Sequence, residues 1–181
     1  MSDRTPAEIS IGGQIPASLV PPLCRAIAVE GLALGWGEAH FEPTSAEDLR
    51  NACSRHDGAD VLWLCDDQAL MGCFDCLEAF LQKNRVAFRR RCDATCEYDR
   101  ELVEYRPKLG LFAGPVNAAG EPVIPVVGFR AVQTDLAKAF ELVKRGDRRG
   151  VAALRSVCKL LGKQLPPLFP PLEPFEIGRR A

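Results

Sequence analysis

Four cysteines lie in two close pairs near the middle of the chain. Cys73 and Cys76 form a Cys-x-x-Cys motif, and Cys92 and Cys96 form a second pair after fifteen intervening residues. Zinc is bound by thiolates at spacings of this kind, and a Cys-x-x-Cys motif can also cycle between a dithiol and a disulfide. A structural zinc site and a redox pair are therefore two chemical interpretations of these residues.

The apolar pattern around the first pair favours a third interpretation. Leu70, Cys73 and the apolar residues after them recur at helical spacing, which predicts a helix from Leu70 to Asn84 with Cys73 and Cys76 on its buried face. Cys73 also lies seven residues beyond Asp66, whereas a thioredoxin-like cysteine directly follows its strand. We therefore expect the pair to pack in the core without a cofactor, and zinc at the four cysteines is the alternative.

Acidic residues offer a second kind of chemistry. Asp66 and Asp67 end the apolar run VLWLC, and Glu38, His40 and Glu42 alternate along another predicted strand. Ligands of open α/β sheets bind at the carboxyl ends of strands, where carboxylates hold divalent metals or act as general bases. Glu38, Asp66 and Asp67 are thus the candidate catalytic residues if the chain is an enzyme. The simpler expectation is that Asp66 or Asp67 caps the next helix or holds a turn.

Two arginines and two phenylalanines are the candidate binding residues. Arg89 and Arg91 alternate in the predicted strand RVAFRRRC, where they could contact phosphate or protect the edge of a sheet. Phe169 and Phe175 belong to a tail with five prolines in thirteen residues, which predicts an extended path. We expect this tail to pack its large apolar side chains over its own domain.

Strands and helices are predicted to alternate over the first part of the chain. This order is typical of an α/β layer whose sheet is mixed and mainly parallel. The apolar run Val61–Cys65 predicts a strand that is covered on both faces. We predict an α/β domain at 1–106, a Pro/Gly-rich connector at 107–128, a helical hairpin at 129–163 and an extended tail at 164–181.

Composition and charge limit the classes of function. Apolar residues make up 47% of the chain, which is normal for a globular protein. No apolar run approaches the ~18 residues of a membrane span, and the first residues do not resemble a secretory signal, so we expect a cytoplasmic protein with reduced thiols. Residues 1–84 carry a net charge of −8 and residues 85–181 one of +7. The two halves either neutralise each other or leave a basic face for an acidic partner.

Three functions remain open on these observations. The first is a non-catalytic accessory protein that binds another protein, because the sequence lacks a convincing catalytic set and ends in a helical hairpin and a proline-rich tail. The second is a divalent-metal-dependent hydrolase that acts on a phosphate ester through Glu38, Asp66 and Asp67. The third is a nucleic-acid-binding protein that uses the basic C-terminal half. Convergence of the three acids in a cleft would favour the enzyme.

Overall fold

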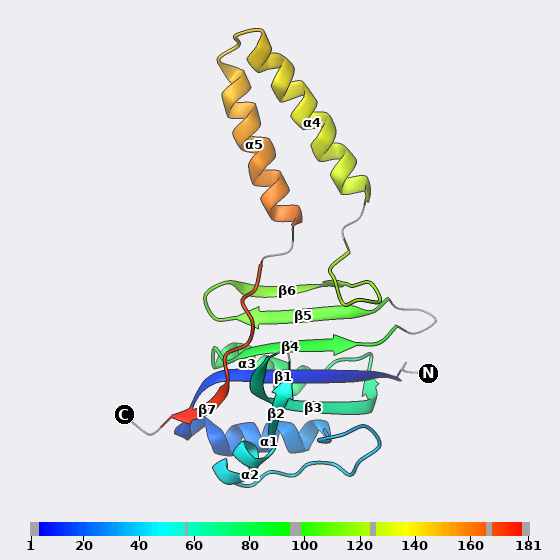
Figure 1. The fold of residues 1–181 in the computed structure, drawn as a ribbon, viewed down its shortest axis with the longest axis vertical. Coiled ribbons are helices and arrows are strands. Elements are labelled where there is room, and N and C mark those ends of the chain that lie inside the picture. Colours follow the sequence, from blue (N-terminus) through cyan, green and yellow to red (C-terminus); the bar gives the residue numbers. More distant parts are fainter. Residues whose placement is uncertain (1–3, 57, 95–98, 124–125, 166–167, 179–181) are drawn as a thin grey trace. The chain divides into compact units, whose positions relative to one another are not determined.

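The computed structural model describes residues 4–56, 58–94, 99–123, 126–165 and 168–178, and these form two compact units (Figure 1). Residues 1–120 and 169–181 form one, here called the sheet unit, and residues 121–168 form the other, the hairpin unit. The hairpin unit is therefore inserted into the sheet unit. The elements of the sheet unit are β1 (Arg4–Pro16), a 3-10 turn (Ala17–Leu19), α1 (Val20–Glu30), α2 (Ala46–Asn51), β2 (Cys53–His56), β3 (Ala59–Leu70), α3 (Asp75–Lys83), β4 (Ala87–Cys92), β5 (Glu101–Arg106), β6 (Gly110–Pro115) and β7 (Phe175–Gly178).

The described strands form one sheet in the order β2-β3-β1-β4-β5-β6, and every neighbouring pair in this order is antiparallel. Only β7 runs parallel to its neighbour, at the Gly13–Pro16 end of β1. The prediction of a mainly parallel sheet is therefore wrong. The physical reason is that the helical crossover from β1 leads to β2, two places away, and β3 fills the gap in the opposite direction. This connectivity is the split βαβ arrangement, in which strands and helices alternate along the chain without parallel neighbours.

Helices α1 and α3 cover one face of the sheet (Figure 1). Helix α1 follows its sequence signals, since two prolines occupy its first turn and Gly31 ends it with a φ of 68°. Alternate residues of the central strands point to these helices because side chains alternate across a strand. The core between the layers contains Ile9, Ile11, Leu23, Ile27, Leu62, Leu64, Leu77, Leu81 and Phe88.

The opposite face of the sheet is partly covered by the C-terminal tail. Val61, Trp63 and Cys65 of β3 form a second apolar cluster with Leu172 of the tail. Residues Val61–Cys65 are all buried, so the prediction of a strand covered on both faces is confirmed. The cover that the sequence could not identify comes from a segment about a hundred residues further along the chain.

Two predicted elements that carry candidate site residues are wrong. The helix predicted from Leu70 starts at Asp75, because β3 extends through Leu70 and a turn follows in which Met71 and Gly72 have φ values of 53° and 66°. The strand predicted to carry Glu38 is a glycine-containing loop, in which only isolated bridges from Ala33 are formed. Backbone in the left-handed region of φ and ψ fits neither a helix nor a strand, so Met71 and Gly72 separate β3 from α3.

The hairpin unit consists of α4 (Val126–Lys144) and α5 (Arg149–Gln164). Its small core contains Val132, Ala139 and Val157. The segment 107–128, predicted as a connector, contains β6 and the start of α4. Among the residues that the structure describes, no helix is both long and apolar enough to cross a membrane.

Candidate binding surfaces

The predicted cysteine set is only partly brought together. Cys73 and Cys92 line the same open hollow beside the β3–α3 turn, and Cys76 is exposed on the first turn of α3. Cys96 lies outside the described residues. The prediction that both cysteines of the first pair pack in the core is wrong, because the later start of α3 gives the buried positions to Leu77 and other apolar residues. Zinc stays a prediction, and the described residues contain no group of three or more metal-ligating side chains.

Two of the three candidate catalytic acids accept backbone hydrogen bonds. Asp66 Oδ1 accepts a hydrogen bond from the backbone N–H of Gln68 at 2.9 Å, and Asp67 Oδ2 accepts one from Gly37 at 2.7 Å. Glu38 is exposed in the same loop as Gly37. The register of β1 and β3 is irregular here, since Ala7 pairs with Asp66 and Thr5 with Ala69, and the two carboxylates hold different backbone N–H groups. The expectation that one of them holds a turn fits this geometry.

Cys65 lies close to these acids but is not an active nucleophile. Burial, followed by the negative charges of Asp67, Glu8, Glu38 and Asp66, raises the pKa of the Cys65 thiol to about 12. The thiolate is the nucleophilic form of cysteine, so at neutral pH this side chain stays protonated and inert.

Arg89 and Arg91 project from β4 on the face of the sheet away from α1 and α3. Arg89 Nε lies 2.6 Å from Glu104 Oε1, and Arg91 Nη1 lies 3.9 Å from Glu8 Oε1. Arg90 points to the helical face, where its guanidinium reaches Glu78 at 2.7 Å. The two predicted binding residues are therefore engaged in cross-strand ion pairs within the sheet.

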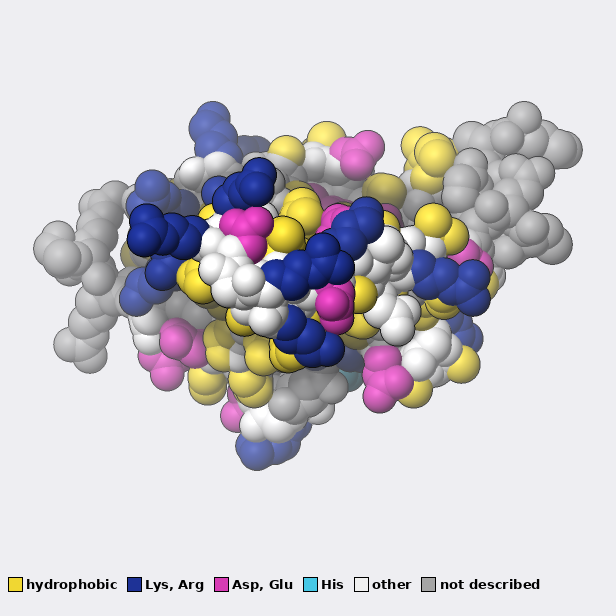
Figure 2. All heavy atoms as spheres, turned by 90° about the horizontal axis from the view of Figure 1, so that it is seen from above, with side chains coloured by type: hydrophobic (Ala, Val, Ile, Leu, Met, Phe, Trp, Pro, Cys, Tyr) yellow, Lys and Arg dark blue, Asp and Glu magenta, His cyan; other side chains and the backbone are white. Residues whose placement is uncertain are grey.

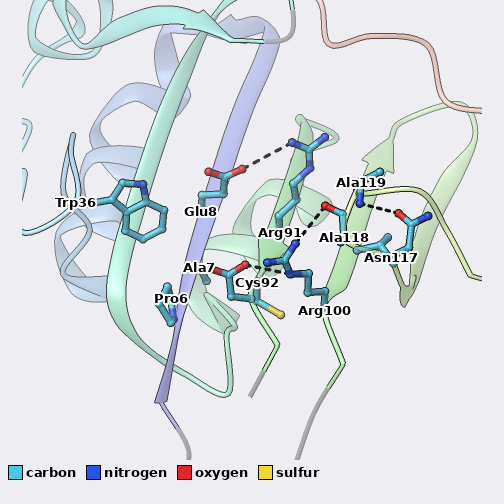
Figure 3. Close-up of a pocket in the computed structure, with 13 residues that line it drawn as sticks. Pro6, Ala7, Glu8, Trp36, Arg91, Cys92, Arg100, Asn117, Ala118 and Ala119 are labelled. Atoms are coloured by element: carbon cyan, nitrogen blue, oxygen red, sulfur yellow. Dashed lines mark hydrogen bonds and ion pairs between the residues drawn. The ribbon is translucent and has the colours of Figure 1, made fainter. Parts of the chain in front are cut away.

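A polar pocket of about 250 Å³ lies beside these residues (Figure 3). Glu8 and Arg91 point toward each other on one side, Trp36 stands on the opposite wall, and Arg100 reaches the 117–119 loop. Arg100 Nε lies 3.4 Å from Asp93 Oδ1, and Arg100 Nη1 donates to the carbonyl of Ala118 at 3.2 Å. Arg91 and Arg100 each face a carboxylate, so the charges that line this pocket nearly cancel. The hydrogen bond from Arg100 to Ala118 holds the 117–119 loop against the sheet.

An aromatic cluster that the sequence did not predict borders the same face. The Trp63 ring stacks on His56 with 5.0 Å between centroids, and Trp36 meets it edge-on at 5.8 Å. Trp63 Nε1 donates to Glu8 Oε2 at 3.2 Å. The only sequence signal was the presence of two tryptophans, which said nothing about their distance in space.

The two candidate phenylalanines of the tail contact the sheet unit itself. Phe175 is buried at the start of β7, and the guanidinium of Arg106 lies 5.5 Å from the centroid of the Phe169 ring. Arg106 also donates to the carbonyl of Pro170 at 2.9 Å. Phe169, Leu172 and Phe175 thus pack on the sheet unit as predicted, whereas Leu165 and Leu168, which were also expected to pack, are exposed.

The hairpin unit exposes an apolar stripe along α4. Phe129, Leu136, Phe140 and Val143 recur at helical spacing, and Phe140 is 56% exposed. The helical spacing of Val132, Leu136, Phe140 and Val143 predicted one buried face, but of these four only Val132 is buried. Val151 and Leu160 of α5 are also exposed.

The hairpin unit as a whole carries positive charge. Residues 121–168 contain nine Lys and Arg but four Asp and Glu, and the residues of α5 include four basic and no acidic side chains. Figure 2 looks onto the end of the hairpin unit where α4 and α5 are joined, and Lys and Arg side chains crowd this end between apolar ones. The hairpin unit thus has a net charge of +5, and the remainder of the chain has one of −6.

Comparison of the chain with protein-family models, with curated proteins and with solved structures found no match.

Proposed function

We propose that this chain is a non-catalytic, cytoplasmic binding protein that holds an acidic amphipathic helix of another protein against its hairpin unit. The observation that carries the proposal is the stripe of α4, in which Phe129, Leu136, Phe140 and Val143 at helical spacing stay 40–56% exposed. Contiguous exposed apolar surface of this kind marks interaction sites. The seven described cysteines are unpaired, which supports a reducing compartment.

The hairpin unit has a small core, so packing against a partner would stabilise it. Val132, Ala139 and Val157 are its buried apolar residues, and two helices with so few buried side chains gain little stability from each other. If a partner covered Leu136 and Phe140, each fully buried side chain would contribute up to about 3 kcal/mol to the free energy of binding. An amphipathic helix can lay its apolar face along such a stripe with contacts at every turn.

Charge identifies the kind of partner. A second copy of the hairpin would bring two units of net charge +5 together, whereas an acidic helix would complement the positive charge of the hairpin unit. Pairing of opposite charges increases the association rate and excludes basic partners.

The remainder of the molecule supports binding rather than catalysis. Asp66 and Asp67 accept backbone hydrogen bonds at turns, and the thiol of Cys65 has its pKa raised to about 12. These groups stabilise local structure, and none of them is placed as an activated nucleophile or base.

Two designed peptides test the proposal with the full-length chain. The first is an amphipathic peptide of ~20 residues with Leu at positions a and d and Glu elsewhere, and the second replaces each Glu by Lys. Fluorescence anisotropy should show binding of the acidic peptide only. Leu136→Ala and Phe140→Ala should each weaken it about tenfold, as at interface hot spots. Thr134→Ala is the control, because residue 134 lies on the opposite side of α4.

Three outcomes would contradict the proposal. Equal binding of both peptides, or of neither, removes the acidic helix as the partner. Sedimentation velocity that shows a dimer, dissociated by Phe140→Glu, assigns the stripe to a second copy. Binding of a single-stranded oligonucleotide that Leu136→Ala does not weaken, while the acidic peptide stays unbound, replaces the proposal with the nucleic-acid alternative.

A further inference from the structure

A second pocket lies under the C-terminal tail, within the sheet unit. It is formed by the end of β1, the residues before β4, the turn between β5 and β6 and the tail segment before β7. Figure 1 shows this segment crossing the ends of these strands on its way to β7. The volume of this tail pocket is about 470 Å³, which lies in the range of pockets that hold small organic ligands.

The walls of the tail pocket combine apolar surface with positive charge. Val86, Leu109 and Pro171 contribute apolar walls. Arg85, Arg106 and Lys108 are its basic residues, and Glu173 is the single acid in its lining. This balance differs from that of the polar pocket, where each arginine faces a carboxylate.

Arg106 is the buried cation of the tail pocket. The residue is only 6% exposed, and its Nη1 donates to the carbonyls of Phe88 at 3.0 Å and Tyr105 at 3.1 Å. Its Nε has no hydrogen-bond partner among the described residues. A buried N–H without a partner is destabilising and accounts for few groups in folded proteins.

The charge of Arg106 is only partly compensated. Glu104 Oε1 lies 3.4 Å from Arg106 Nη2 but 2.6 Å from Arg89 Nε, so this carboxylate is shared and lies closer to Arg89. Burial lowers the pKa of Arg106, which reflects the unfavourable desolvation of its cation. An anion in the pocket would offset the cost of this desolvation by its attraction to the cation.

We propose that the tail pocket binds a small organic anion, a monocarboxylate with an apolar body. The carboxylate lies toward Arg85, Arg106 and Lys108, and the apolar body lies against Val86, Leu109 and Pro171. A neutral apolar molecule would supply no negative charge to the three cations, and a cationic molecule would be repelled by them. This inference concerns the sheet unit and does not depend on the function proposed for the hairpin.

Three probes separate the contributions of charge and apolar body. Octanoate has both, octanol has the body without the charge, and acetate has the charge without the body. With the ¹⁵N-labelled full-length chain, octanoate should shift the backbone amide signals of Gly12, Gly13 and Leu109, and the two controls should bind more weakly. These residues line the pocket, so the shifts would locate the ligand there.

A double variant tests the role of the exposed cations. Arg85→Gly with Lys108→Ala should weaken octanoate about tenfold and leave octanol unchanged. Glycine suits residue 85 because its φ is 57°, so the charge is removed without backbone strain. Lys83→Ala is the control, since Lys83 is an exposed cation two residues away that does not line the pocket.

The proposal is overturned if octanol binds as tightly as octanoate, or if the double variant binds octanoate like the unchanged chain. It is also overturned if octanoate shifts only the amides of α4, which would assign the binding to the apolar stripe of the hairpin.

Discussion

The carbonyl oxygen of Glu173 lies against Gly12, in the space that a side chain at residue 12 would occupy. This close approach allows the backbone N–H of Gly13 to donate to the carbonyls of Glu173 at 3.0 Å and Pro174 at 3.1 Å. The tail is therefore hydrogen-bonded to β1 before β7 begins. The absence of a side chain at Gly12 thus allows the tail to approach β1 closely.

Gly12→Ala should lower the free energy of unfolding by about 1–3 kcal/mol, the usual effect of an overpacked site. The contacting atom belongs to the backbone and cannot rotate away. Urea denaturation measures the effect. Gly162→Ala is the control, since open space surrounds Gly162 inside α5 and alanine should stabilise that helix by about 0.5–1 kcal/mol. Unchanged stability of Gly12→Ala would show that the tail does not take this path.

The tail should also contribute apolar packing. Leu172 is buried in the cluster with Trp63, so Leu172→Ala should lower the free energy of unfolding by about 2–5 kcal/mol. Leu168 is 97% exposed, and Leu168→Ala should change it by less than about 0.5 kcal/mol. Thermal and chemical denaturation of the two variants provide the comparison. Equal effects would contradict the described position of the tail.

The buried ion pair of Arg90 and Glu78 should be sensitive to removal of one partner. Arg90 is 3% exposed, its Nε lies 2.7 Å from Glu78 Oε1, and it also reaches the carbonyl of Gly72 at 2.5 Å. Arg90→Ala leaves the carboxyl of Glu78 buried without its cation and should destabilise the fold by about 3–5 kcal/mol. Arg90→Met with Glu78→Leu should recover a large part of this loss. A double variant no more stable than Arg90→Ala would contradict the coupling.

The strands and helices could be predicted where local chemistry decides them. The two prolines and Gly31 mark the ends of α1, and the run Val61–Cys65 marks a strand buried on both faces. The order of the strands could not be predicted in this way. Split and parallel βαβ arrangements have the same alternation of elements, and only packing decides whether β3 lies between β1 and β2.

The candidate sites depended even more on tertiary contacts. Met71 adopts a φ of 53°, a left-handed conformation that the sequence does not predict for methionine. The turn that contains it delays the start of α3, and Cys76 is exposed instead of lying on the predicted buried face. The outward positions of Arg89 and Arg91 followed from strand alternation. Arg106 carried no sequence signal, because its importance comes from burial beneath a tail that returns from the far end of the chain.

Asp67 should act as a structural acceptor and not as a metal ligand. Asp67→Ala removes the hydrogen bond from the Gly37 N–H and should lower the free energy of unfolding by about 1 kcal/mol. Asp60→Ala is the control, since its exposed contact with Arg55 is 4.0 Å long and should contribute almost nothing. Titration with Mg²⁺ should leave the melting temperature unchanged. A rise that Asp67→Ala abolishes would restore the metal-dependent hydrolase as the better hypothesis.

The capping box of α2 should make stability depend on pH in the acid range. Hydrogen bonds from Thr44 and Ser45 lower the pKa of Asp48 below its ordinary value of 3.8, with the backbone N–H of Thr44 as the largest cause. Because the folded-state pKa is the lower one, the carboxylate stabilises the fold above the ordinary pKa. This contribution is lost as the pH falls through the folded-state pKa.

Urea denaturation between about pH 2 and pH 6 measures this contribution. Asp48→Asn should lose part of the rise in stability with pH. Ser45→Ala should lower the free energy of unfolding by about 1 kcal/mol, because the Ser45 Oγ accepts from the Asp48 N–H at 3.1 Å. An Asp48→Asn profile parallel to that of the unchanged chain over the whole range would show that the Asp48 carboxylate does not cap the helix.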